Sequence, residues 1–146
     1  MSTTADKVMG ARGDDVATVG PDARLADVVR ILADRRIGAV VVTADDEVRG
    51  IVSERDIVRL LADEGPACLD TPVSQAMTGD VSTCSPSATT DELMATMTAG
   101  RFRHVPVTGD GGRLIGIVSI GDIVKSTIEQ LQIDKESLTE YVTGGY

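Results

Sequence analysis

Aromatic side chains are almost absent from this chain of 146 residues: they make up 2% of it, with one Phe and no Trp. Proteins that bind single-stranded nucleic acid stack bases on such rings, and a net charge of −9 repels phosphate backbones and anionic membranes. We therefore expect no nucleic acid and no membrane as a partner. Hydrophobic residues still make up 42% of the chain, enough for a soluble globular protein with an aliphatic core.

Histidine and cysteine are also scarce. The chain has one His and two Cys, Cys68 and Cys84, and it lacks a CxxC motif. Because a structural zinc site takes four such ligands, no metal site is expected, and we interpret both cysteines as buried free thiols in a reducing cytoplasm. The N-terminus lacks the apolar segment of a signal peptide, and the most apolar run, IGAVVV, is too short to cross a bilayer. A cytoplasmic location is therefore predicted.

What the chain does contain is an internal duplication. At a shift of 65 residues, Arg36 falls on Arg101 in two similar stretches. An additional glycine in TGDGGR then changes the shift to 66, and GIVSERDIV (50–58) coincides with GIVSIGDIV (116–124). A glycine-rich turn is where a repeat tolerates an insertion best. The sequence is therefore interpreted as two copies of one structural unit.

Each copy is predicted to fold as β-α-β-β-α. A short β-stretch (DVATV or DVSTC) precedes an amphipathic helix, two β-rich runs joined by ADDE or GDGG form a hairpin, and a second helix begins at or just after the Ser of the repeated frame. The apolar stripes expected on the first helices are Leu25, Val28, Val29 and Leu32, and Thr90, Leu93, Met94 and Met97. Gly50 and Gly116 are expected to allow close backbone approach at the hairpins.

The duplication also sets the expected domain boundaries. A first domain, a connection, a second domain and a C-terminal extension are placed at residues 8–65, 66–80, 81–132 and 133–146. A unit of about 60 residues buries too little apolar surface alone, so the two copies should pack together. In the extension we predict a short helix with Asp134 as its cap, docked by Leu138 and by Tyr141 or Val142.

The Ser and Asp of the repeated frame have two interpretations. In the structural one, Ser53 and Ser119 are N-caps and the acids three residues later, Asp56 and Asp122, complete capping boxes. In the functional one, the start of a helix attracts phosphate, and a carboxylate there accepts two hydrogen bonds from the vicinal diol of a ribose. The spacing alone does not decide between these interpretations.

The ordered set of motifs resembles a pair of cystathionine β-synthase (CBS) domains, often called a Bateman module. Each copy has V-x-T-V/C-x-P, then h-x-h-P or VVV, then G-h-V-S-x-x-D, and the resemblance runs from about Val16 to about Leu131. It implies an α/β (α+β) fold of two β-α-β-β-α repeats packed with pseudo-twofold symmetry. It also implies a homodimer, and two clefts that bind an adenosine compound: AMP, ADP, ATP, S-adenosylmethionine or NAD, with AMP or ATP favoured.

The resemblance assigns roles to individual residues. Asp56 and Asp122 would hold ribose hydroxyls, and Ser53 and Ser119 would contact phosphate or ribose. The other residues that it places in the clefts or beside the base are Thr18, Ala39, Val40, Thr83, His104, Val105 and Pro106. The expected function is that of a stand-alone regulatory module that binds a nucleotide and signals to an unknown protein partner.

The two copies differ at charged positions. Copy one has Arg55 beside the ribose Asp, where copy two has Gly121. In the preceding strand the pattern is reversed, because RFRHVPV carries Arg101, Arg103 and His104 where copy one reads RIGAVVV. We therefore predict that Arg55 meets phosphates, that Arg103 is a ligand-binding residue of the other charged stretch, and that the clefts differ in affinity, to the point where one could stay empty.

Two other classes of function compete with this one. A ligand-free interaction or scaffold module would use the S-x-x-D frames only as helix caps. An enzyme is not expected, because the sequence shows no nucleophile–base pair, P-loop or metal constellation. His104, the single histidine, is interpreted as a packing or hydrogen-bonding residue rather than a catalyst.

Overall fold

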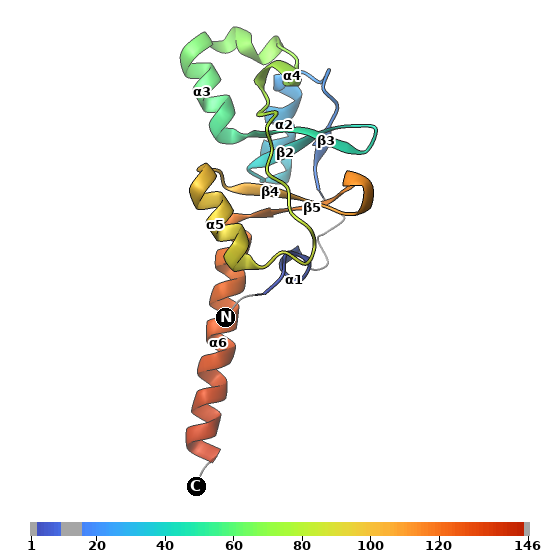
Figure 1. Cartoon of the computed structure of the whole chain (residues 1–146). Helices are drawn as coiled ribbons and strands as arrows, with labels where there is room; N and C mark the ends of the chain where they lie inside the picture. Colours follow the sequence, from blue (N-terminus) through green and yellow to red (C-terminus); the bar gives the residue numbers. More distant parts are fainter. Residues whose placement is uncertain (1–2, 10–15, 145–146) are drawn as a thin grey trace.

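The computed structural model describes residues 3–9 and 16–144, and the side chains up to residue 139 (Figure 1). Copy one has the predicted order of elements. They are β1 (Thr18–Val19), α2 (Leu25–Arg35), β2 (Ala39–Ala44), β3 (Glu47–Ser53) and α3 (Glu54–Glu64). The three strands form one sheet in the order β1-β2-β3, with β1 parallel and β3 antiparallel to β2.

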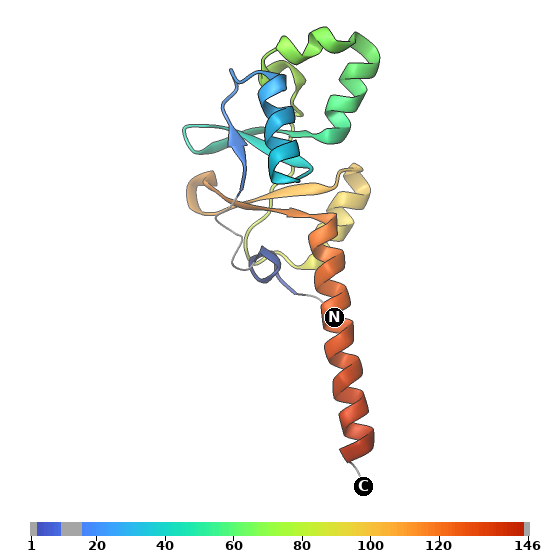
Figure 2. The same cartoon turned by 180° about the vertical axis from the view of Figure 1, so that it is seen from behind.

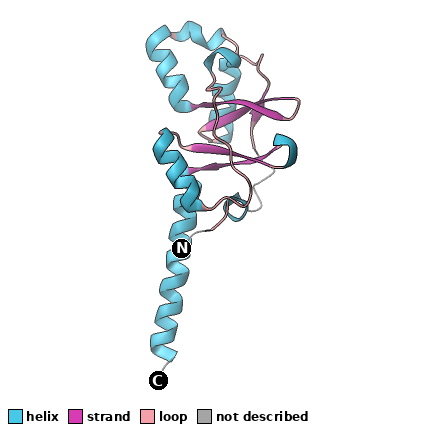
Figure 3. Cartoon of the chain, in the orientation of Figure 1, coloured by secondary structure: helices cyan, strands magenta, loops and turns pink. Residues whose placement is uncertain are grey.

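Copy two repeats this order with one reduction. Its elements are α5 (Thr90–Gly100), β4 (His104–Thr108), β5 (Leu114–Ser119) and α6 (Ile120–Gly144). The expected first strand is represented by a single parallel bridge between Cys84 and Val107. The second sheet, β4-β5, is therefore two-stranded. The predicted fold, two similar units of mixed helix and strand, is confirmed, and Figure 3 shows the two hairpins meeting between the helices of the two units.

The two hairpin turns explain the one-residue change of shift. Asp45 and Asp46 form a two-residue loop with φ of 54° and 63°, the left-handed pair that a type I′ turn requires. In copy two, the short 3₁₀ helix η3 (Asp110–Gly112) fills the longer loop, where Gly111 and Gly112 adopt φ of 72° and 79°. The additional glycine is thus accommodated where glycine tolerates the backbone conformation best.

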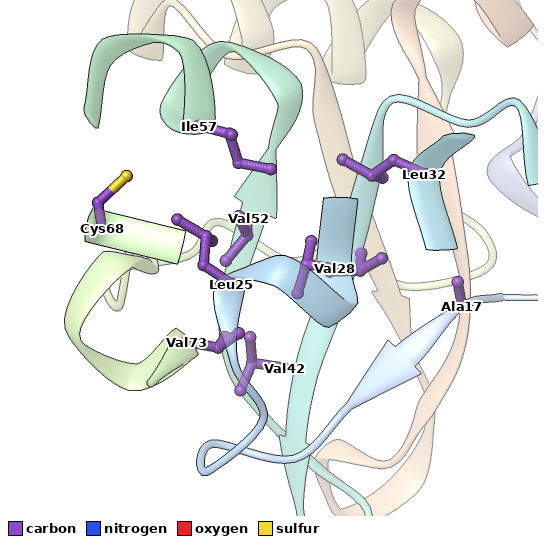
Figure 4. Close-up of a cluster of buried hydrophobic side chains, with 10 residues drawn as sticks. Ala17, Leu25, Val28, Leu32, Val42, Val52, Ile57, Cys68 and Val73 are labelled. Atoms are coloured by element: carbon purple, nitrogen blue, oxygen red, sulfur yellow. The ribbon is translucent and has the colours of Figure 1, made fainter. Parts of the chain in front are cut away.

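Each copy borrows a segment that precedes the other copy. The helix α1 (Ala5–Met9) contributes Ala5 and Met9 to the core of copy two. Conversely, the connection, with η2 (Pro66–Asp70) and α4 (Val73–Ala76), contributes Cys68 and Val73 to the core of copy one (Figure 4). Four backbone hydrogen bonds, two in each copy, hold these segments in place. In copy one, Leu25 N donates to Thr71 O (3.0 Å) and Val73 N to Ala23 O (2.7 Å). The equivalent bonds in copy two run from Thr90 N to Thr3 O (2.8 Å) and from Ala5 N to Ala88 O (2.8 Å).

The two cores are aliphatic, as the composition predicts. On the first helices, Leu25, Val28 and Leu32 are buried in copy one, and Thr90, Leu93 and Met97 in copy two. The prediction that Val29 belongs to the apolar stripe of α2 is wrong, because its side chain is 37% exposed. Only the other three predicted positions of this helix face the core. Cys68 and Cys84 are both free thiols; Cys68 is buried and Cys84 half-buried, and burial raises the pKa of Cys84 to about 11.

Gly50 provides the predicted close approach. A Cβ atom at this position would lie 2.9 Å from the backbone oxygen of Thr78, a distance that side chains do not adopt. The adjacent Ile51 exchanges two backbone hydrogen bonds with Thr78, of 3.0 and 2.9 Å. Gly50 therefore lets the segment before copy two pass directly against β3.

The prediction of a separate short helix in the C-terminal extension is wrong. Residues 133–144 continue α6 without a break, and Asp134 lies inside the helix, where it accepts a hydrogen bond from Gln130 Nε2 at 3.1 Å. The sequence between Ile123 and Thr143 has no Gly or Pro that would end the helix. Leu138 is 65% exposed rather than docked, and the side chains of Tyr141 and Val142 lie outside the described part. Figures 1 and 2 show α6 extending well beyond the body of the molecule.

Among the helices of the described residues, none combines the length and the apolar character needed to span a bilayer.

Candidate functional site

The repeated Ser and Asp form a capping box at the start of each second helix. Ser53 N donates to Asp56 Oδ2 at 2.9 Å, and Asp56 N donates to Ser53 Oγ at 3.3 Å. In copy two, the corresponding distances for Ser119 and Asp122 are 3.0 and 3.1 Å. The structural interpretation of the frame is therefore correct for both copies. It does not exclude the functional one, because all four side chains are half-buried rather than enclosed.

The first cavity lies between the two copies and opens beside Ser53 and Asp56. Its volume is about 270 Å³. Its walls are residues 38, 51, 53–56 and 59 of copy one, residues 78 and 80 of the connection, and residues 81, 82 and 100–104 of copy two. The start of α3 therefore faces the loop that joins α5 to β4.

The second cavity, of about 440 Å³, lies beside Ser119 and Asp122. Its walls are Met9 of α1, residues 16, 17 and 35–39 of copy one, and His104, Ile117, Ser119 and Asp122 of copy two. The start of α6 faces the loop between α2 and β2, which is the equivalent of the loop in the first cavity. The two cavities are thus related by the duplication, and both are close in volume to the pockets of about 300–1,000 Å³ that bind small molecules.

His104 belongs to the walls of both cavities. It lies against Gly38, where a Cβ atom would be 3.4 Å from its Nε2. Burial lowers the pKa of His104 below its ordinary value. The negative charges of Asp122, Glu54 and Asp56 oppose this shift, and the positive charge of Arg103 adds to it. The imidazole is therefore mostly neutral at pH 7, and it lies near the carboxylates of both capping boxes.

Six of the chain's 14 basic side chains line the cavities, and all six are arginines. Arg55, Arg59, Arg101 and Arg103 line the first cavity, and Arg35 and Arg36 the second. The four in the first cavity are exposed, and within the described residues none of them forms an ion pair. A guanidinium group binds phosphate oxygens in a bidentate manner. In a chain with a net charge of −9, these arginines are concentrated at the cavities, where the first also has the acids Glu54, Asp56 and Asp80 and the second has Asp122.

Comparison with known proteins identifies the family. The family model of the CBS domain matches residues 11–63 and 73–129, one match to each copy. The chain belongs to the CBS-domain family.

Relatives and solved structures agree with this identification. The mitochondrial CBS domain-containing protein CBSX3 of Arabidopsis thaliana is 32% identical over 154 residues, which cover 99% of this chain and 74% of the relative. The crystal structure of the CBS-domain containing protein ATU1752 from Agrobacterium tumefaciens is 50% identical, has a TM-score of 0.80, and covers 86% of this chain and 99% of that one. The CBS domain protein PAE2072 of Pyrobaculum aerophilum, complexed with AMP, is 26% identical with a TM-score of 0.73, covering 82% and 89%.

The structure brings most of the predicted site residues of this CBS pair to the two cavities. Ser53, Arg55, Asp56, Arg103 and His104 line the first cavity. Ala39, His104, Ser119 and Asp122 line the second. Each set therefore combines the helix start of one CBS repeat with a loop or strand of the other.

The remaining predicted residues lie elsewhere. Val40, Val105 and Pro106 are buried in β2 and β4, and Val40 and Val105 pack in the cores of copy one and copy two. Thr18 and Thr83 are exposed, and their neighbours Ala17 and Ser82 line the cavities instead.

Several wall residues were not predicted from the sequence. Arg59 lies one helical turn after Arg55, so the (i, i+4) spacing could have revealed it. Arg35 precedes the predicted first loop. Asp80 and Met9 belong to the segments that precede the two repeats, and no pattern in the sequence indicates that these segments cross to the other copy.

Proposed function

We propose that this CBS pair is a regulatory module that binds an adenosine-containing nucleotide in the cavities between its repeats and signals to another protein. The observation that carries this proposal is the pairing, in both cavities, of a Ser–Asp helix start from one repeat with arginines on the facing loop of the other repeat. The AMP complex of the 26% identical Pyrobaculum aerophilum protein supports it.

The chemistry of the walls suits the parts of a nucleotide. Asp56 and Asp122 would accept hydrogen bonds from the ribose diol, as acids do in dinucleotide folds. In both capping boxes the backbone N–H donates to Oδ2, which fixes the orientation of the carboxylate. Arginines of the facing loop would then bind the phosphates.

The arginine content extends the proposal to the choice of nucleotide. The first cavity, with four arginines, would bind ADP or ATP, whose additional phosphates need additional cations. The second, with two, would bind AMP or a ligand of lower charge. Because the four arginines are exposed, the phosphates would lie on the solvent side of the first cavity, outside its volume of about 270 Å³.

Calorimetric titration with AMP, ADP, ATP, S-adenosylmethionine and NAD tests this function. We expect binding of at least one of them, together with a stabilisation of about 2.7 kcal/mol at a free concentration of a hundred times the dissociation constant. A chain that binds none of these compounds would contradict the proposal. It would leave the ligand-free interaction module, which the intact capping boxes favour.

A homodimer is included in the proposed arrangement. The second helices of both repeats expose large apolar side chains at equivalent positions, namely Val58 of α3 at 64% and Val124 of α6 at 48%. Leu61 and Ile128 extend these patches, at 37% and 52%. Exposed apolar patches favour association, and a ligand that changes the packing of the repeats would change the surface presented to a partner.

A further inference from the structure

The described side chains in the distal half of α6 are all exposed. The start of the helix is anchored, because Ile123 is 2% exposed and α6 packs on α1, α5 and β5. From Leu131 to Thr139, in contrast, every residue is exposed, and both views of the molecule show this part of the helix projecting away from the body (Figures 1 and 2). A helix of this length without tertiary contacts is marginal in water. Its stability therefore requires something to cover it.

The exposed apolar residues of α6 follow a heptad pattern. Val124, Ile128, Leu131 and Leu138, together with Lys135, are spaced by alternating steps of four and three residues. Their side chains form one stripe, and the four apolar ones are between 48% and 65% exposed. Val142 continues the spacing in the sequence. A stripe with this repeat is the pattern by which α-helices wind around each other in a coiled coil.

The residues at the heptad positions indicate the partner. Ile128 and Lys135 occupy a positions, and Leu131 and Leu138 occupy d positions. β-Branched residues at a with Leu at d favour two parallel strands, and a single Lys at a fixes register and oligomeric state. In a parallel pair in register, Lys135 packs beside the residue that precedes the same position in the other copy, and this residue is Asp134. The opposite charges therefore complement each other across a pair of identical helices.

We infer that α6 forms a parallel two-stranded coiled coil with α6 of a second copy of this chain. A lipid surface fits less well, because Glu129, Asp134 and Glu136 are exposed on the same helix and would be repelled by anionic headgroups. The inference does not depend on nucleotide binding. It commits the dimer to a two-fold axis along α6.

Sedimentation measurements on the full-length chain test the pairing. Leu131→Asp places a charge in the stripe, at a residue that is 61% exposed. The matched control is Ile133→Asp, a substitution of a 55% exposed apolar residue on the same helix outside the stripe. We expect the wild type and Ile133→Asp to be dimers at micromolar concentrations, and Leu131→Asp to weaken the dimer by about a hundredfold or more, since a charge would be buried without a partner. A monomeric wild type, or a dimer that Leu131→Asp leaves intact, would overturn the inference.

Disulfide cross-linking tests the orientation. In a parallel pair the two copies of a d position face each other within disulfide range, so Leu138→Cys should give a covalent dimer under mild oxidation. Ile133→Cys should not, and the wild type controls for Cys84 and the buried Cys68. An absence of the covalent dimer in Leu138→Cys, or equal yields in the two variants, would contradict the parallel arrangement.

Discussion

The two cavities of this CBS pair share a Ser–Asp helix start and differ in their other charged residues, because Glu54 and Asp80 line only the first cavity and the number of arginines is not the same. Each has a Ser–Asp capping box at a helix start, with N–H to Oδ2 distances of 2.9 and 3.0 Å. The first cavity adds four arginines and the second two. In the proposed function, the duplicated Ser–Asp pairs would hold the sugar, which every adenosine ligand has. The arginines that only the first cavity has would then bind additional phosphates, whose number distinguishes one nucleotide from another.

Each cavity has one arginine at an equivalent position of the duplication, and both of these arginines have an unusual backbone conformation. Arg36 and Arg101 are equivalent in the duplication, and each follows its helix with a left-handed backbone, at φ of 55° and 57°. Glycine is the usual residue at such a helix end, and another residue costs about 1 kcal/mol there. Arginine at both positions, each in a cavity wall, is consistent with a binding role that offsets the strain.

The largest expected effect is on nucleotide binding when the carboxylate of one capping box at a time is removed. Asp56→Ala should weaken binding in the first cavity by about a hundredfold or more, because two hydrogen bonds to a charged group are lost at about 1.5–3 kcal/mol each. Asp122→Ala should do the same in the second cavity only. Calorimetry would show the loss of one class of sites in each variant and retention of the other.

Asp27→Ala is the matched control for these variants. Asp27 completes a capping box at the start of α2, with Arg24 N donating to its Oδ2 at 3.3 Å, and it is outside both cavity walls. All three substitutions should cost about 1 kcal/mol of folding stability through the lost cap. If Asp27→Ala reduced nucleotide binding as much as Asp56→Ala, the effect of both would be structural and the assignment of ribose to Asp56 would fail.

A smaller effect should distinguish the cavities by their arginines. Replacing Arg55 and Arg59 by Ala leaves the first cavity with two arginines, the number in the second. Affinity for ATP should fall by about ten- to a hundredfold, the range expected for charge-assisted hydrogen bonds, whereas affinity for AMP should change much less. Titrations with both nucleotides measure the ratio. Arg49→Ala is the control, because Arg49 pairs with Glu47 at 3.7 Å outside the cavities. Equal losses for ATP and AMP would refute a selection by phosphate number.

The sequence predicts the Ser and Asp residues of the capping boxes better than it predicts the residues of the facing cavity walls. The S-x-x-D frame occurs twice and has a local cause, the capping box, so the positions of Ser53, Asp56, Ser119 and Asp122 follow from the pattern alone. The β-α-β-β-α order follows similarly from periodicity and turn residues. The facing walls depend on long-range packing. The crossing of α1 to copy two, which brings Met9 to the second cavity, has no local signal.

The same distinction applies to the other predicted features. The resemblance assigns Thr18 and Thr83 to the clefts, whereas the neighbouring residues Ala17 and Ser82 line the cavities of this structure. The separate C-terminal helix was predicted from a possible cap at Asp134. A cap is effective only where the helix is otherwise interrupted, and α6 is continuous from Ile120 to Gly144.

The smallest expected effect concerns the residue that the two cavities share. Burial lowers the pKa of His104, so the unfolded chain binds a proton at this residue at a higher pH than the folded chain does. Stability should therefore fall as pH decreases through the unfolded value of about 6.5, by less than about 1.4 kcal/mol per pH unit, and the loss should level off below the folded pKa. His104→Gln should lack this component when urea unfolding is compared at pH 7.5 and about 5.5.

Binding should respond in the opposite direction. Protonated His104 adds a positive charge to the walls of both cavities, so phosphate binding should tighten in both as pH decreases, and by similar factors. His104→Gln should remove the tightening from both. If only one class of sites responded, His104 would belong functionally to one cavity, and the difference between the cavities would then extend from their arginines to the wall that separates them.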